Sequence, residues 1–324
     1  MAPKQGNIMS FRPDIKVVDA TIRDGGLVND FYFTDEFVKK LYETNVKAGV
    51  DYMEFGYKAS KDIFDETKFG KWKFCKEEDL RAIVGNNDTK MKISVMADVG
   101  RTDLERDIID KEDSVIDIIR IATYINTIPA AIDMAEYCKS KGYETSINIM
   151  AISTASESDI RQALELICRS SVDMIYIVDS YGAIYPEEMR DLMDLFVEFG
   201  QKYNKKIGIH AHDNQKLAFA NTIEAVSRGV SMLDATVCCL GRGAGNCAME
   251  ALLGFLKNPR YRLDPLLRFI QNEMLKLKQE IVWGYDIPYL ITGMLNMHPR
   301  TAINFIKEGD TDYSLLYHEL WARE

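Results

Sequence analysis

The sequence has little that would mark a membrane, secreted or nucleic-acid-binding protein. Its apolar runs are all shorter than the ~18–20 residues that a membrane-spanning helix needs. Residues Met1–Ser10 are polar and lack the apolar stretch of a signal peptide. The 40 basic and 50 acidic side chains give a formal net charge of −10, which argues against binding nucleic acid or an anionic membrane surface. We therefore expect a cytoplasmic protein without nucleic-acid or membrane partners.

Cysteine and histidine are also sparse. The six cysteines are scattered without the spacing of a disulfide framework, which predicts reduced thiols in a cytosolic protein: Cys75, Cys138, Cys168, Cys238, Cys239 and Cys247. The chain has only four histidines. It also lacks a Gly-x-Gly-x-x-Gly turn after the first predicted strand, which argues against a dinucleotide-binding open sheet.

What the chain does have is a regular alternation of short apolar runs and helical stretches. Eight runs rich in β-branched residues predict strands: Ile15–Val18, Tyr52–Phe55, Ile93–Met96, Ile116–Ile121, Thr145–Met150, Met174–Val178, Ile207–Ile209 and Met232–Val237. Eight strands, each followed by a helix, predict a (β/α)8 TIM barrel, with a doubly wound open sheet as the alternative. We assign residues 1–258 to the barrel domain and residues 259–324 to a helical C-terminal extension.

Helix boundaries are marked by their usual residues. Thr34 is the expected N-cap of a helix that Gly49 ends. Ser156 begins a capping box. Pro186 suits the first position of a helix that we expect to end at Gly200.

Polar residues stand at the predicted carboxyl ends of the strands, where barrel enzymes carry their chemistry. Listed along the chain they are Arg23-Asp24, Glu54, Asp98, Arg120, Asn148, Asp179-Ser180, His210-Ala-His212-Asp213 and Gly241–Asn246. A solvated rim does not require Arg and Asn inside otherwise apolar runs. The pattern therefore favours an active site at this end of the barrel.

The His-x-His stretch predicts a metal site. His210 and His212 face the same side of a strand, about 7 Å apart. With Asp24 they form a mixed oxygen and nitrogen set that suits Mn²⁺ or Mg²⁺, with Zn²⁺, Co²⁺ or Fe²⁺ as alternatives. Asp213 is either near this set or a partner that orients one histidine.

The motifs "DATIRDGG", "IHAHDN" and "GRGAGN" together resemble those of the metal-dependent barrel lyases and condensing enzymes. This superfamily includes 4-hydroxy-2-oxovalerate aldolase, hydroxymethylglutaryl-CoA lyase and isopropylmalate synthase. The aldolases are the most similar, because "IIRIATYINTIPAAIDMAEYCKSKGYE", "IVDSYGAIYPEEMRDLM" and "GYDIPYLITGML" also follow their pattern.

The resemblance implies a class II aldolase or lyase that makes or breaks a carbon–carbon bond beside a 2-oxo acid, through a pyruvate-type enolate. It implies Asp24, His210 and His212 as metal ligands and Arg23 as the cation that stabilises the enolate oxygen. Ser180 would meet a substrate carboxylate, Tyr285 would lie near the substrate, and Asn246 would approach the metal or the substrate. Glu54 and Arg120 either bind substrate or pair with each other inside the barrel.

Some positions depart from the family pattern. The aldolases have a histidine as base where this chain has Leu27, and the synthases have a glutamate where it has Gly26. The strand-four Thr-His-Cys of the aldolases is here Thr123-Tyr124-Ile125. The candidates for proton transfer are then a water on the metal, Asp30 and Tyr285.

Two other functions remain as alternatives. One is a Claisen-type acyltransferase that condenses an acyl-CoA with a 2-oxo acid, and the other is a non-catalytic, metal-bound scaffold subunit. Aldolases of this type often dock a dehydrogenase through their helical region. Apolar side chains in the extension therefore lead us to expect a homodimer, with a dehydrogenase as an alternative partner: Phe269, Met274, Leu275, Ile281, Trp283, Tyr289 and Leu290.

Overall fold

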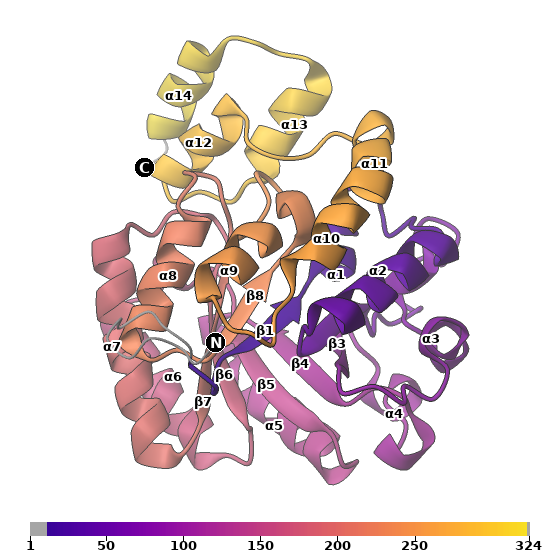
Figure 1. Ribbon diagram of the computed structural model, residues 1–324. Helices are drawn as coiled ribbons and strands as arrows, with labels where there is room; N and C mark the ends of the chain where they lie inside the picture. The colour runs from indigo at the N-terminus through magenta and orange to yellow at the C-terminus, as the bar shows by residue number, and fades with distance from the viewer. Residues whose placement is uncertain (1–11, 323–324) are drawn as a thin grey trace.

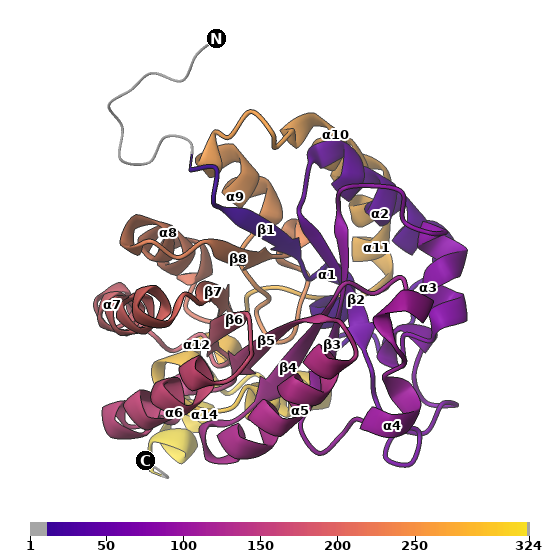
Figure 2. The ribbon, with the colours of Figure 1, turned by 90° about the horizontal axis from the view of Figure 1, so that it is seen from below.

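The computed structural model describes residues 12–322, in which eight parallel strands close into a barrel in sequence order (Figures 1 and 2). The strands are β1 (Lys16–Asp19), β2 (Tyr52–Tyr57), β3 (Lys92–Asp98), β4 (Ile118–Thr123), β5 (Glu144–Ile149), β6 (Met174–Asp179), β7 (Lys206–Ala211) and β8 (Met232–Ala235). Strand β8 pairs with β1 in parallel, with Lys16 opposite Met232. The predicted (β/α)8 barrel is confirmed, and the open sheet is wrong.

Helices surround the barrel on the outside (Figure 2). They are α2 (Asp35–Ala48), α3 (Glu77–Val84), α4 (Leu104–Asp107), α5 (Ile128–Ser140), α6 (Glu157–Arg169), α7 (Pro186–Tyr203), α8 (Ala218–Arg228) and α9 (Met249–Leu256). The short helix α1 (Thr21–Gly25) is buried and lies at the mouth of the barrel instead. The helices that follow are α10 (Leu263–Phe269), α11 (Leu275–Glu280), α12 (Ile287–Met294), α13 (Arg300–Glu308) and α14 (Tyr313–Trp321). None of the helices within residues 12–322 is both long and apolar enough to cross a membrane.

The predicted helix ends are largely confirmed. The Thr34 hydroxyl accepts a hydrogen bond from the backbone N–H of Phe37, and Gly49 ends α2 in the left-handed region at φ 80°. The Ser156 side chain likewise caps α6, and Pro186 begins α7. The expectation that Gly200 ends α7 is wrong.

Helix α7 instead continues to Tyr203, and Asn204 caps it in the left-handed region at φ 55°. Gly200 serves packing: a Cβ there would lie 2.8 Å from Cγ1 of Ile207 on the adjacent strand. A glycine near the end of a predicted helix can thus mark a close helix–strand contact, and the sequence alone does not distinguish this from a helix end.

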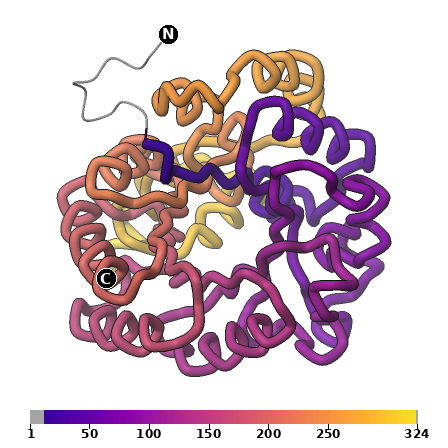
Figure 3. The backbone as a smooth tube through the Cα atoms, turned by 60° about the horizontal axis from the view of Figure 1, so that its bottom comes forward, coloured from indigo at the N-terminus to yellow at the C-terminus, as the bar shows by residue number. Residues whose placement is uncertain are grey.

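The chain after α9 packs on the barrel in two places. Helix α10 lies against α2, where the Phe269 and Phe37 rings are 5.3 Å apart. Helices α12, α13 and α14 form a cap at one end of the barrel, at the top of Figure 1 and behind the barrel opening in Figure 3. The cap has its own small core of Ile291, Leu295, Leu316 and Leu320.

The barrel interior is filled in layers. One layer is an apolar cluster that includes Tyr52, Ile118, Met174 and Tyr176. The guanidinium of Arg120 stacks on the Tyr176 ring at 4.3 Å and begins a layer of buried charges. The interior is therefore a packed core, and the site can only lie toward the mouth of the barrel.

Candidate active site

The Arg23-Asp24 pair lies on α1, a one-turn helix that directly follows β1. Gly26, which directly follows α1, is in the right-handed helical region, so a left-handed turn is not the reason for a glycine here. A Cβ at Gly26 would lie 2.2 Å from Cδ1 of Phe31, so only glycine lets the chain fold back this closely. The segment after β1 is therefore a tightly packed helix, which fixes Arg23 and Asp24 in the barrel mouth.

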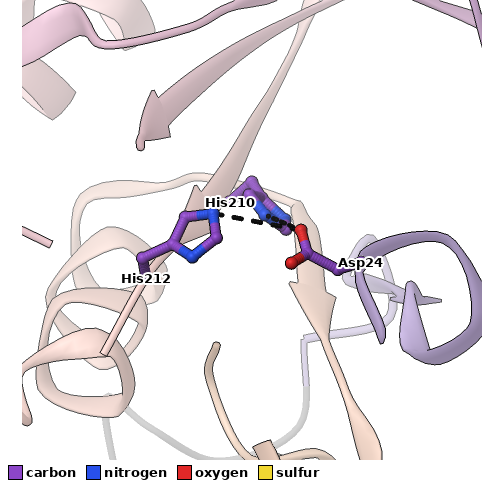
Figure 4. Close-up of side chains that lie close together, drawn as sticks. All are labelled: Asp24, His210 and His212. Atoms are coloured by element: carbon purple, nitrogen blue, oxygen red, sulfur yellow. Dashed lines mark hydrogen bonds and ion pairs between the residues drawn. The ribbon is translucent and has the colours of Figure 1, made fainter. Parts of the chain in front are cut away.

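Asp24, His210 and His212 converge at this mouth (Figure 4). Each offers one ligand atom, and the three atoms lie within 4.8 Å of one another. The Oδ2 atom of Asp24 is 3.1 Å from Nε2 of His210 and 3.9 Å from Nε2 of His212. All three side chains are buried. Asp24 lies on α1, His210 lies on β7, and His212 directly follows β7.

The protonation states of Asp24 and His212 suit a divalent cation. Burial opposes ionisation of Asp24, but Arg23 and the two histidines hold its pKa well below the usual range. Burial lowers the pKa of His212 to about 3, against the opposing effect of Asp24, so its imidazole is neutral. A carboxylate and a neutral imidazole are the forms that bind metal.

Asn246 lies beside the same set. Its Nδ2 is 3.1 Å from Nε2 of His210, and its buried Oδ1 has no hydrogen-bond partner among the described residues. An amide oxygen without a partner next to two imidazoles and a carboxylate fits a bound cation. The site therefore fits a divalent metal ion.

A chain of buried ion pairs lies beneath the metal ligands. Glu54 accepts from Nε of Arg23 at 2.7 Å and lies 3.1 Å from Nη1 of Arg120. Arg120 donates to Asp234 at 2.7 Å, and Asp234 in turn lies 2.9 Å from Nδ1 of His210. The chain thus connects Arg23 to His210 through alternating charges, which fixes the orientation of both.

A cavity of about 40 Å³ opens over these groups. Its walls are Arg23, Asp24, Leu27, Tyr57, Met96, Ala122, Asn148, Met150, Val178, Ser180, His210, His212 and Arg242. One water molecule needs roughly 10–15 Å³ of such space. The cavity therefore holds only a group of a few atoms. Asn148 contributes a buried Nδ2 that has no partner among the described residues.

The other predicted site residues do not all lie at this cavity. Ser180 lines the cavity, and its hydroxyl accepts from the backbone N–H of Ala151 at 2.9 Å. Glu54 and Arg120 pair with each other and are not among the described residues that line the cavity. Tyr285 is 38% exposed and lines a neighbouring cavity, and Asp30 is exposed.

The alternative for Asp213, a contact that orients a histidine, is wrong. Its Oδ1 accepts from the backbone N–H of Ala218 at the start of α8. Asp234 takes that place, on the short strand β8. A carboxylate inside the run "MLDA" was the available signal, since an unpaired charge is costly within a buried strand.

Residues 14–271 match the HMGL-like family over most of the chain. The chain belongs to this family. Among its HMGL-like relatives, 4-hydroxy-2-oxovalerate aldolase from Bacillus cereus is 27% identical over 267 residues, covering 79% of this chain and 73% of the relative. Oxaloacetate decarboxylase from Mycobacterium tuberculosis is 29% identical over 245 residues, covering 74% and 69%.

Solved structures agree with this membership. The N-terminal domain of a proposed aldolase from Bacteroides vulgatus superposes with a TM-score of 0.77 at 27% identity, covering 90% of this chain and 96% of that chain. The carboxyl transferase domain of Rhizobium etli pyruvate carboxylase, at 14% identity and a TM-score of 0.66, shows the fold alone; 91% of this chain and 55% of that chain are covered. The HMGL-like chain is a lyase, as the motifs predicted, and its relatives are named aldolase and decarboxylase.

Two polar cavity residues received no role of their own in the sequence analysis. Tyr57 follows Glu54 and Gly56 at the end of β2, and Arg242 stands between two glycines of "GRGAGN". The backbone N–H of Arg242 donates to Oδ1 of Asp24 at 2.8 Å, and its Nη2 donates to the Ser180 carbonyl at 2.9 Å. The position of Tyr57 three residues beyond a buried strand carboxylate, Glu54, was the only signal for it.

Proposed function

We propose that the protein is a divalent-metal-dependent aldolase that forms or cleaves the carbon–carbon bond beside a small 2-oxo acid, with pyruvate as the simplest case. The single observation that carries this proposal is the convergence of Arg23 with Asp24, His210 and His212 on one small cavity. A cation in this set supplies a Lewis acid for a 2-oxo carbonyl. The mixed oxygen and nitrogen ligands favour Mn²⁺ or Mg²⁺, with Zn²⁺, Co²⁺ or Fe²⁺ as alternatives.

Arg23 stabilises the enolate. Its guanidinium is 5% exposed and faces the cavity, while Glu54 fixes its Nε. A fixed cation in a site of low dielectric stabilises developing charge without reorganising at the moment of reaction. The free Nδ2 of Asn148 and the hydroxyl of Ser180 are placed to hold the substrate carboxylate.

Tyr57 is our candidate for proton donor. It lines the cavity, and burial raises the pKa of its hydroxyl well above the usual value, so the group stays protonated at neutral pH. Asp30 is exposed, and Tyr285 lines the neighbouring cavity. Of the titratable side chains proposed for proton transfer, Tyr57 is the one that shares the cavity with Arg23.

Turnover of two substrates tests the proposal. Cleavage of 4-hydroxy-2-oxovalerate to pyruvate and acetaldehyde by the metal-loaded protein would support it. A relative named oxaloacetate decarboxylase makes decarboxylation the second candidate, because loss of CO₂ from oxaloacetate gives the same enolate. Pyruvate from oxaloacetate alone would identify a decarboxylase, and pyruvate from neither would contradict the aldolase proposal.

We further propose a cytoplasmic homodimer, with a dehydrogenase as the alternative partner. All six cysteines are free thiols, as expected in a reducing compartment. Phe269 and Met274 are buried against the barrel, so they do not contribute to a docking face. Leu275, Leu315 and Trp321 are each at least half exposed and support association. A monomeric mass in sedimentation at tens of micromolar, with no captured dehydrogenase, would contradict this.

A further inference from the structure

A second cavity lies between the barrel mouth and the C-terminal cap. Its volume is about 230 Å³, several times that of the cavity over the metal ligands. Its walls come from the segment after α1, the segment after β8, the loop before α12, and helices α12 and α13. The residues are Leu27, Val28, Arg242, Gly243, Val282, Trp283, Gly284, Tyr285, Asp286, Tyr289, Ile303, Ile306 and Lys307.

The two cavities share walls. Leu27 and Arg242 line both of them. Arg242 is held in place by its bonds to Asp24 and to the Ser180 carbonyl, whereas the Leu27 side chain is 36% exposed and makes only apolar contacts. A molecule bound over the metal ligands therefore reaches the second cavity by extending past a leucine.

The second cavity is mostly apolar and aromatic. The Trp283 indole N–H donates to the Cys238 carbonyl at 2.9 Å, so its hydrogen-bonding need is met outside the cavity. The Nζ atom of Lys216 lies 3.9 Å from the centre of the Tyr285 ring. Ile303 and Ile306 from α13 supply aliphatic surface. Arg242, Asp286 and Lys307 are the charged members of the lining, and its apolar and aromatic majority suits a hydrophobic group.

We infer that this cavity binds the apolar substituent of the aldehyde partner, which is an aromatic or medium-chain aldehyde. This inference rests on the proposed aldolase function. The small cavity accepts only the 2-oxo acid, so the other partner of the new bond lies beyond Leu27. The enolate carbon bonds to the aldehyde carbon, the proton lost from the 2-oxo acid passes to the new alkoxide, and the product is a 4-hydroxy-2-oxo acid.

The test uses the full, Mn²⁺-loaded chain with pyruvate and a series of aldehydes. Each methylene buried in the cavity is worth about fourfold in kcat/KM, so hexanal should exceed acetaldehyde by roughly 10²-fold. Phenylacetaldehyde should behave like hexanal. Ile306→Trp fills the cavity and should reduce the hexanal-to-acetaldehyde ratio at least about tenfold. The control Leu166→Trp, on the exposed face of α6, should leave that ratio unchanged.

Binding is measured separately through Trp283. Phenylacetamide, which cannot react, should quench the protein fluorescence, and Trp283→Phe should remove that quench. Solvent exchange of the pyruvate methyl protons reports on the proposed function without any aldehyde. Exchange combined with equal kcat/KM for all aldehydes would overturn the inference and leave the aldolase proposal standing. A quench without exchange would overturn the proposed function and with it the assignment of the cavity to an aldehyde.

Discussion

At the scale of single residues, the metal ligands are fixed by hydrogen bonds and ion pairs with neighbouring groups, of which Asp234 lies outside the motifs. Asp24 is held by Arg23 and by the backbone N–H of Arg242, and His210 is held by Asp234. Each ligand thus has a second partner that sets its orientation, as is usual for metal sites in proteins. Two predictions follow from these contacts.

Replacing the histidines should remove the metal without unfolding the barrel. The ligands lie at the mouth, outside the large core cluster, so His212→Ala and the His210→Ala/His212→Ala double variant should keep the circular dichroism spectrum. The double variant should cost about 1–3 kcal/mol, because Asp234 loses His210 and keeps only Arg120 as a partner. Elemental analysis should find less than one tenth of the wild-type metal. Full occupancy in the double variant would refute the ligand assignment.

Asp234→Asn should weaken metal binding although Asp234 is not a ligand. The change removes the carboxylate that orients His210, and the usual loss for such a partner is about 10–100-fold in affinity. Titration with Mn²⁺ in competition with a chelator measures it. Asp213→Asn is the matched control, because Asp213 caps α8 and should leave the affinity within about twofold. Equal losses in both variants would show a general structural effect.

At the scale of elements, the strands and most helix ends could be predicted because they depend on local sequence. Short apolar runs rich in β-branched residues identified all eight strands to within a few residues, since both faces of a barrel strand are buried. Thr34 and Gly49 marked their helix because capping involves only neighbouring backbone groups. Gly200 gave a wrong helix end, because a glycine is needed there for the close contact with Ile207 on another element. Local sequence does not encode that contact.

The short 3₁₀ helix η1 (Lys71–Lys73) shows the same limit, since its last residue is a buried lysine. The ammonium of Lys73 lies 4.2–5.8 Å from the ring centres of Phe31, Tyr57, Phe64 and Phe69. Lys73 makes no ion pair among the described residues. Burial lowers its pKa to about 8, opposed by Asp98 and reinforced by Arg101.

Lys73→Met should therefore stabilise the protein in a pH-dependent way. The folded state releases the lysine proton near pH 8 and the unfolded state near 10.5, so the charge destabilises the fold below pH 8. The variant should be more stable by about 1–3 kcal/mol at pH 7, and this gain should shrink between pH 8 and 10. Urea unfolding of both proteins at pH 7 and pH 10 measures it. A gain that is equal at both pH values would contradict the prediction.

At the scale of the whole molecule, the barrel and the end that carries the site were predictable, and the surroundings of the site were not. Asp24, His210 and His212 stood out because the carboxyl ends of parallel strands must meet at one mouth. Asp234, Tyr57 and the second cavity depend on which residues face each other across the closed barrel and beneath the cap. Some of those contacts join positions far apart in the sequence, as between Arg120 and Asp234, which are 114 residues apart.

The most direct test of the account is solvent exchange of the methyl protons of pyruvate, followed by NMR in deuterium oxide with saturating Mn²⁺. If the metal ligands and Arg23 together stabilise an enolate, exchange should proceed without any aldehyde. Arg23→Lys keeps the charge but loses the planar guanidinium, and it should slow exchange by roughly 10²–10³ while metal affinity stays the same. Arg228→Lys, on the surface at the end of α8, should exchange at the wild-type rate. Absence of exchange in the wild-type protein for any short 2-oxo acid would contradict the enolate chemistry proposed here.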